Sequence, residues 1–298
     1  MACMYYPPSY KSIITENLRE FFLYHDDKNV HLVIQTHVKA PDGLPERLAW
    51  VIPFPVLPTK YEVSDPHVFE ELYKLFGSSS SKGGDMVRGG LGGAPSNAMP
   101  KSPVLVHATQ VIGDYKVHPI EVVSDLDLKN TATVLDSWLT KKGFNSIPFD
   151  LQKPYIKKGA TFLAIELNPK GTEADVKPLH IIFPKAGSGF SIPLRLTHDT
   201  RAFDLRIYTF GFAKSWADKD AFWSKNFGDA YFKMDYPQSY FEWHRENPAI
   251  TKLLAQSQGH IRFYSINQFN APGQLRARQL PKDPTFNWES VKAVPKIR

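Results

Sequence analysis

The segment 30–58 has a pattern that is typical of antiparallel strands. Residues 30–38 alternate between apolar and polar side chains, as in a strand with one buried face. After a polar turn, residues 47–54 form a short apolar run that continues into Pro55 and Pro58. Proline cannot donate a hydrogen bond to a strand ladder, so it favours strand ends and sheet edges. We therefore expect an antiparallel sheet here.

Strand patterns recur along the rest of the chain, and the Gly113-Asp114 dipeptide predicts a tight hairpin turn between two of them. Apolar residues at helical spacing predict three helices, at 65–76, 125–142 and 237–258. We expect an α+β fold with mostly antiparallel sheets built from hairpins and about three helices packed on one face. The predicted strands are 21–26, 30–38, 47–54, 104–112, 115–123, 160–168, 178–184, 190–197, 202–213 and 260–269.

The composition of two segments divides the chain. Residues 77–103 are rich in glycine and serine, which predicts a flexible loop. Residues 271–298 are interpreted as an extended C-terminal tail. We interpret 1–76 and 104–270 as one α+β domain, with two sub-domains that meet near residue 150 as the alternative.

Charge and cysteine content narrow the class of protein. Residues 1–150 carry 14 basic and 17 acidic side chains, whereas 151–298 carry 22 basic and 13 acidic ones. A basic second half can attract anions, but a solvated basic face is the favoured explanation. The one cysteine, Cys3, excludes an intrachain disulfide, and no apolar stretch reaches the length of a membrane span. The first residues lack a signal-peptide pattern, which indicates a cytoplasmic protein or a mature form without its leader.

Several short motifs follow one another over more than half of the chain. The first is Ala49-Trp50-Val51 with Pro53 and Pro55, which has the form Ala-Trp-Val-x-Pro-x-Pro. The others are Gln110-Val111 with Gly113, Tyr115 and Val117; Trp138-Leu139 with Gly143-Phe144; Pro154-Tyr155-Ile156 with Gly159, Phe162 and Ala164; and Pro193 with Arg195-Leu196-Thr197. Their order resembles a bacterial secreted family of unknown function.

This resemblance implies export across the cytoplasmic membrane and a cysteine close to the mature N-terminus. Here Cys3 fits that position, as a lipid anchor or a free thiol. Members often have a second cysteine nearby, which this chain lacks. The resemblance implies no activity, cofactor or catalytic residue. We therefore expect an extracytoplasmic protein whose leader is absent from this sequence.

Two pairs of histidines are candidate metal ligands. His31 and His37 lie six residues apart on one predicted strand and so share a face. In the hairpin about the predicted turn, His107 is expected opposite residue 120 and His118 opposite residue 109, which makes the two histidines diagonal neighbours. If the two pairs meet, they can bind copper or zinc with Cys3 as a soft ligand. The alternative is four histidines on a solvated face.

Signals for catalysis are weak. No zinc-protease, dinucleotide-binding or phosphate-loop motif occurs. Glu166 lies in an otherwise apolar strand, and we favour an orientation toward solvent. An inward orientation would require a partner because a buried, unpaired carboxylate is costly, and Arg195 is the candidate.

The segment 214–245 interleaves aromatic and basic residues. Such a surface can stack bases or sugars, but no nucleic-acid motif accompanies it. Core packing together with a protein interface is the favoured interpretation, because aromatic residues and arginine dominate interface hot spots. The expected anchors are Trp216, Trp223, Tyr231, Tyr236, Trp243 and Arg245.

The sequence thus favours a non-enzymatic extracytoplasmic protein of the periplasm, cell surface or medium. We expect it to assemble with copies of itself or to bind another surface protein, without a cofactor and without specific nucleic-acid binding. Membrane contact is expected only through a lipid on Cys3. The alternative is a copper- or zinc-binding or thiol-dependent enzyme that uses Cys3 and the paired histidines.

Overall fold

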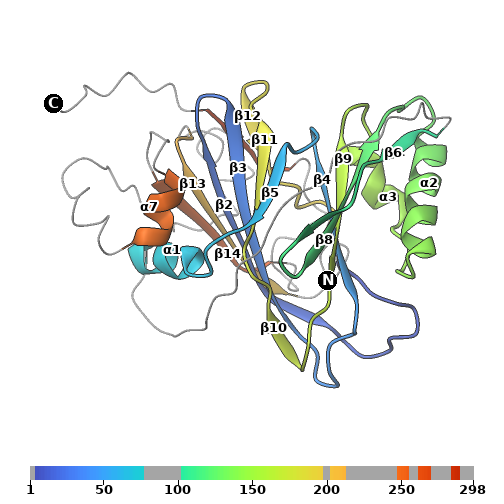
Figure 1. Cartoon of the computed structure of the whole chain (residues 1–298), viewed down its shortest axis with the longest axis horizontal. Coiled ribbons are helices and arrows are strands. Elements are labelled where there is room, and N and C mark those ends of the chain that lie inside the picture. Colours follow the sequence, from blue (N-terminus) through green and yellow to red (C-terminus); the bar gives the residue numbers. More distant parts are fainter. Residues whose placement is uncertain are drawn as a thin grey trace.

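Two sheets pack face to face, and helices lie on the outer side of each sheet (Figure 1). The computed structural model describes residues 4–76, 102–196, 202–212, 247–254, 261–269 and 283–288. All described strand pairs are antiparallel except one. The predicted α+β class with mostly antiparallel sheets is therefore confirmed.

The larger sheet has seven strands, in which the long hairpin of β2 and β3 is central. β13 pairs with β2 in parallel, and β10 pairs with one end of β3. In order across the sheet, the strands are β14 (Ile261–Phe269), β13 (Phe203–Phe210), β2 (Thr15–His25), β3 (Asn29–Lys39), β11 (Leu179–Pro184) and β5 (Lys60–Val63), with β10 (Glu173–Asp175) beside β3.

The smaller sheet has six strands, and all seven residues of its strand β4 are buried. Pro53 lies in β4 beyond the end of β1, which pairs only with Ala49 and Trp50. This position agrees with the expected place of proline at the end of a strand. The strands are β1 (Met4–Tyr5), β4 (Leu48–Phe54), β9 (Thr161–Leu167), β8 (Tyr115–Val122), β6 (Val104–Val106) and β7 (Gln110–Ile112).

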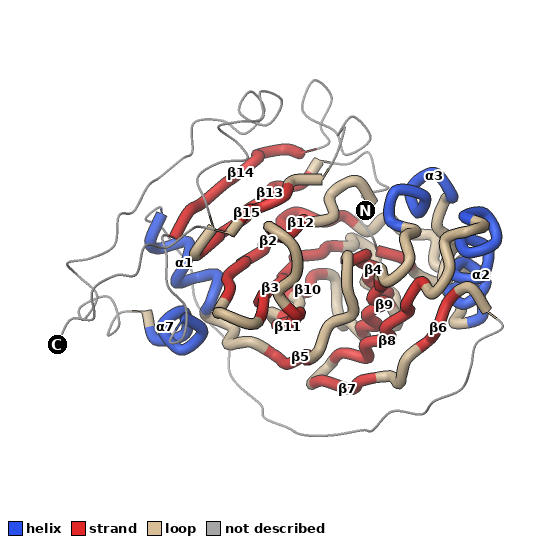
Figure 2. The backbone as a smooth tube through the Cα atoms, turned by 90° about the horizontal axis from the view of Figure 1, so that it is seen from above, coloured by secondary structure: helices blue, strands red, loops and turns tan. Residues whose placement is uncertain are grey.

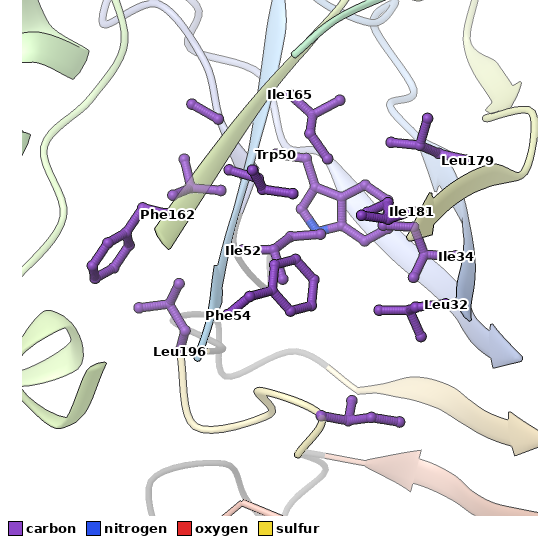
Figure 3. Packing of buried hydrophobic residues seen from close by; sticks show 14 of the residues in the cluster. Leu32, Ile34, Trp50, Ile52, Phe54, Phe162, Ile165, Leu179, Ile181 and Leu196 are labelled. Carbon is purple, nitrogen blue, oxygen red and sulfur yellow. The ribbon is translucent and has the colours of Figure 1, made fainter. Parts of the chain in front are cut away.

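The main hydrophobic core lies between the two sheets (Figure 3). Alternate residues of β4 point toward the larger sheet because successive side chains of a strand face opposite ways. The rings of Phe54 in β4 and Phe183 in β11 have centroids 4.7 Å apart, so the sheets are in direct contact. The side chains drawn at this interface include Trp50, Ile52, Phe54, Leu32, Ile34, Leu179 and Ile181.

The helices are divided between the two outer faces, whereas the sequence predicted a single layer on one face (Figure 2). α1 (Val68–Phe76) and α7 (Pro248–Leu254) cover the larger sheet and pack on Phe22, Val33 and Tyr208. α2 (Leu128–Lys141) and α3 (Phe149–Gln152), followed by the short 3-10 helix at Lys153–Tyr155, lie beside the smaller sheet. None of the described helices combines the length and apolar character that a membrane-spanning segment requires.

The ends of the helices follow from local sequence. Asp127 caps α2 by accepting the backbone N–H of Asn130 at 3.0 Å, and Gly143 stops it with a φ of +85°. α7 begins at Pro248, a residue suited to the first helical turn. The buried carboxylate of Glu71 in α1 accepts the N–H groups of Ala249 and Ile250, which joins the two helices.

Part of the predicted C-terminal tail is packed against the fold. β15 (Thr285–Asn287) pairs with β12 (Gly189–Ser191), and Phe286 is fully buried. Trp288 then donates its indole N–H to the carbonyl of Gly187 at 2.8 Å. Residues 77–101 lie outside the described residues, and the division into one domain or two sub-domains stays an interpretation.

Trp50→Ala should lower the free energy of unfolding by about 3–5 kcal/mol, because a fully buried indole at the sheet interface leaves a cavity. Denaturant unfolding measures this change. The control Leu126→Ala, at a side chain that is 96% exposed, should change it by about 0.5 kcal/mol or less. An equal decrease in the free energy of unfolding in the two variants would contradict the described core.

Candidate functional site

The carboxylate of Asp26 organises the turn between β2 and β3. Its Oδ1 accepts the backbone N–H groups of Lys28 at 2.7 Å and Asn29 at 2.6 Å. Its Oδ2 lies 3.1 Å from Nε2 of His31, near the start of β3. One side chain therefore closes the hairpin and orients an imidazole ring.

Two imidazole rings meet on the outer face of the larger sheet. Nδ1 of His31 in β3 lies 3.0 Å from Nε2 of His180 in β11. His31 is opposite Ile182 in the antiparallel register, so His180 is its diagonal neighbour on the same face. On its other side, Nδ1 of His180 lies 2.9 Å from Oε1 of Glu62, which is opposite it in β5.

Tyr24 in β2 completes the cluster. It is opposite His31 in the register of β2 and β3, and the two rings stack with centroids 4.5 Å apart. Its hydroxyl oxygen lies 3.1 Å from Nε2 of His180. We call Tyr24, Asp26, His31, Glu62 and His180 the histidine-pair site.

The hydrogen-bond partners determine where the ring protons lie. Ionised carboxylates only accept hydrogen bonds, so Nε2 of His31 and Nδ1 of His180 are both protonated and donate to Asp26 and Glu62. The other two nitrogens face each other, and two facing lone pairs would repel. The Tyr24 hydroxyl, 3.1 Å from Nε2 of His180, can donate to that nitrogen and satisfy its lone pair.

Both carboxylates of the site are ionised at neutral pH. Burial by itself raises the pKa of Asp26, but hydrogen bonds from His31 and from the turn outweigh burial and lower this pKa to about 2. The hydrogen bond from His180 lowers the pKa of Glu62 to about 2, against the opposing effect of burial. Burial also lowers the pKa of His31, because it disfavours the charged ring.

The other three histidines that the sequence singled out each lie beside a carboxylate of their own. The two predicted pairs stand on different sheets. Within the described part of the chain, no group of three or more His, Cys, Asp or Glu side chains could hold a metal ion. Cys3 lies outside that part, so a metal site with all four histidines stays a prediction. The contacts are His37–Glu20 (3.6 Å), His107–Glu121 (2.8 Å) and His118–Glu166 (2.9 Å).

Glu166 in β9 faces the interior, so the expected orientation toward solvent is wrong. Its side chain is 8% exposed and binds Nη2 of Arg47 at 2.9 Å as well as Nε2 of His118. Arg47 therefore occupies the role expected for Arg195. The ring of Trp138 from α2 packs edge-on against His118, with centroids 5.2 Å apart.

A break in the predicted hairpin separates His107 from His118. β6 pairs with β8 in a register one residue different from that of β7, and the N–H of His107 donates to the carbonyl of Pro119. His107 therefore lies opposite residue 119, so its predicted place opposite residue 120 is wrong. Pro119 has no N–H to donate, which accounts for the ladder dividing at this point. The predicted proximity of 109 to 118 is confirmed by a bond between Thr109 and His118.

The expected interface residues lie outside the described residues. These are Trp216, Trp223, Tyr231, Tyr236, Trp243 and Arg245. Their role as interface anchors stays a prediction.

Four members of the histidine-pair site were not predicted from the sequence. His180 lies in a strand that was predicted, but the neighbour of that strand in the sheet was unknown. A signal was present, because His180 is the one polar residue within the apolar run 179–183. A polar residue in a buried strand requires partners.

A family model described as an uncharacterized protein conserved in bacteria (DUF2330) matches residues 1–256. The chain belongs to this family. The match does not extend to the role of Cys3 or of the Ala-Trp-Val motif, which stay predictions. No curated protein matches the chain.

Solved structures of a baculovirus protein are distantly similar to this chain in their backbone. Baculovirus P35 is 10% identical with a TM-score of 0.48, and the match covers 92% of this chain and 97% of that chain. P35 in a complex with caspase-8 is 9% identical with a TM-score of 0.42, and the match covers 91% of this chain and 96% of that chain. At this level of similarity the neighbours support no inference about function.

The free energy of unfolding should fall as pH drops below about 6.5, the ordinary pKa of histidine. Burial lowers the pKa of His118 in the folded protein, so the unfolded chain binds this proton first. The contribution of neutral His118 to the free energy of unfolding is therefore fully present above about pH 6.5 and is lost as the pH falls below it. His118→Gln should reduce the slope of stability against pH, whereas His67→Gln, at an exposed position, should not. Identical slopes in His118→Gln and the wild type would contradict this account.

Proposed function

We propose that the protein is a non-enzymatic extracytoplasmic protein that assembles with copies of itself. Its family is uncharacterized, so the proposal rests on the chain itself. The extracytoplasmic location is supported by the resemblance of its motifs to a secreted family. Assembly is supported by an exposed apolar sheet edge.

Two buried histidines are held in ways that favour a structural role. His118 has Thr109 at 2.8 Å from Nδ1 and Glu166 at 2.9 Å from Nε2. His25 binds the carbonyl of Gly211 through Nε2 at 2.6 Å, and Nζ of Lys185 lies 3.0 Å from Nδ1. A general acid or base needs a ring nitrogen within reach of a substrate, and here protein groups occupy both nitrogens of each ring.

The observation that carries the proposal is a group of exposed valines where the edges of the two sheets adjoin. Val111 in β7 is 67% exposed and Val106 in β6 is 42% exposed. Val63 at the end of β5 is 37% exposed, and its Cγ2 would lie 2.8 Å from a Cβ on Gly113, next to β7. We call Val63, Val106 and Val111 the valine edge. Apolar strand edges readily pair with further strands.

A second copy of the chain is the partner that fits this edge. Among the described strands only β8 pairs with β7, so one side of β7 is open in that part of the structure. Antiparallel pairing of two copies about Val111 places this valine opposite itself. Such a two-fold contact is self-complementary. The aromatic segment 214–245 is the predicted source of further anchors.

Wild-type protein should form a dimer, and the dimeric fraction should rise with protein concentration. Size-exclusion chromatography with light scattering measures this fraction. Val111→Lys should weaken the dimer at least about tenfold, since burial of a valine is worth roughly 1.5 kcal/mol and each copy contributes one. Two facing lysines also repel each other.

The matched control is Ile13→Lys, because Ile13 is a similarly exposed apolar residue (55%) that lies outside the valine edge. This variant should dimerise as the wild type does. A wild type that stays monomeric at all concentrations would contradict the proposal. If Val111→Lys leaves the dimer unchanged, the valine edge is not the interface. The double variant Trp216→Ala and Trp223→Ala then tests whether the aromatic segment 214–245 forms the interface.

In bacteria that express the native gene, the protein should be digested by protease added outside the cytoplasmic membrane. Cys3→Ala should shift it from the membrane fraction to the soluble extracytoplasmic fraction if Cys3 carries a lipid. Fractionation with immunodetection measures both. Full protection from protease until the cytoplasmic membrane is broken would exclude the proposed location.

A further inference from the structure

The histidine-pair site has a donor arrangement that is typical of a metal centre. Metal-bound histidines usually donate their second ring N–H to a carboxylate or carbonyl, which fixes the ring and increases its basicity. Both rings of this site have that support, His31 from Asp26 at 3.1 Å and His180 from Glu62 at 2.9 Å. The two nitrogens without a carboxylate are the two that face each other at 3.0 Å.

We propose that Nδ1 of His31 and Nε2 of His180 bind one Cu²⁺ ion between them. Two nitrogens 3.0 Å apart can each lie about 2.1 Å from one ion, with an angle of about 90° at the ion. An angle of this size fits the tetragonal geometry that Cu²⁺ prefers with nitrogen and oxygen donors. The rings turn about their Cβ–Cγ bonds to direct both lone pairs at the ion.

Oxygen donors complete the coordination. The hydroxyl of Tyr24 lies 3.1 Å from Nε2 of His180, on the ligand side of the ring. Burial raises the pKa of this phenol, so Tyr24 acts as a weak neutral donor and the affinity comes from the two imidazoles. Water occupies the remaining positions.

The charge around the site favours a cation. With neutral rings, the ionised carboxylates of Asp26 and Glu62 leave two negative charges, which a divalent ion balances. Lys60 pairs with Glu62 at 2.7 Å, but its side chain is 61% exposed and screened by water. The side chains of His31 and Asp26 are 14% and 18% exposed, so the site is partly exposed to solvent on the side of the turn.

The test is a titration of the metal-free full chain with CuCl2. Calorimetry measures the affinity and stoichiometry, and electron paramagnetic resonance reports the ligands of the ion. We expect one Cu²⁺ per chain and a tetragonal spectrum with coupling to two imidazole nitrogens. His31→Gln and His180→Gln should each weaken binding at least about a hundredfold. Asp26→Asn removes the carboxylate that orients His31 and one negative charge of the site, and should weaken binding about ten- to a hundredfold.

Three control variants locate the ion. His118→Gln removes another buried histidine with a carboxylate partner, on the other sheet, and should leave the affinity unchanged. Cys3→Ser should also leave it unchanged, and Tyr24→Phe should change it less than tenfold. Circular dichroism checks that each variant is folded.

The proposal is overturned if the wild type takes up no stoichiometric Cu²⁺. It is also overturned if binding survives in both folded histidine variants, or if the wild-type spectrum shows sulfur or a single nitrogen as ligand. Should His180→Gln fail to fold, the more exposed His31→Gln and the wild-type spectrum decide. This inference is independent of the proposed assembly, because the valine edge lies on other residues and has its own readout.

Discussion

The face-to-face burial of the two sheets is the constraint on which the rest of the structure depends. Side chains alternate along a strand, so fixing one face of β3 in the core fixes what the other face presents. Leu32 and Ile34 point into the interface with β4, and His31 and Val33 therefore point to the outer face. A shift of one residue would exchange the two sets and place a histidine in the apolar core.

Polar groups inside this fold are held in pairs that connect distant parts of the chain. Glu166 joins β9 to His118 in β8 and to Arg47 before β4, while Glu71 joins α1 to the first turn of α7. A buried charge without a partner is costly, so these contacts favour one arrangement of the strands and helices. The histidine-pair site differs in one respect, since its two central nitrogens face each other with the Tyr24 hydroxyl beside Nε2 of His180.

The sequence was sufficient for most local elements. The alternation of 30–38 and the helical spacing of 125–142 depend on nearby residues, and the structure has a strand and a helix there, the helix beginning at Leu128. Long-range pairing was not predictable in this way. Arg47 and Glu166 are far apart in the sequence, and nothing local distinguishes Arg47 from Arg195 as the partner.

The same limit explains the site. His31 was selected because of its spacing from His37, but its partner His180 comes from a strand nearly 150 residues later. The pattern of a strand indicates which of its residues share a face. It does not indicate which other strand lies beside that strand in the sheet. The division of the 104–123 hairpin at Pro119 is a second case, because the proline was visible but the resulting change of register was not.

The protonation of the two facing rings tests the account most directly. Nitrogen-15 NMR of the histidine side chains in the metal-free protein distinguishes protonated from unprotonated ring nitrogens. The account predicts protons on Nε2 of His31 and on Nδ1 of His180 that exchange slowly with water. Two rings that exchange freely with solvent and show no contact with each other would contradict it.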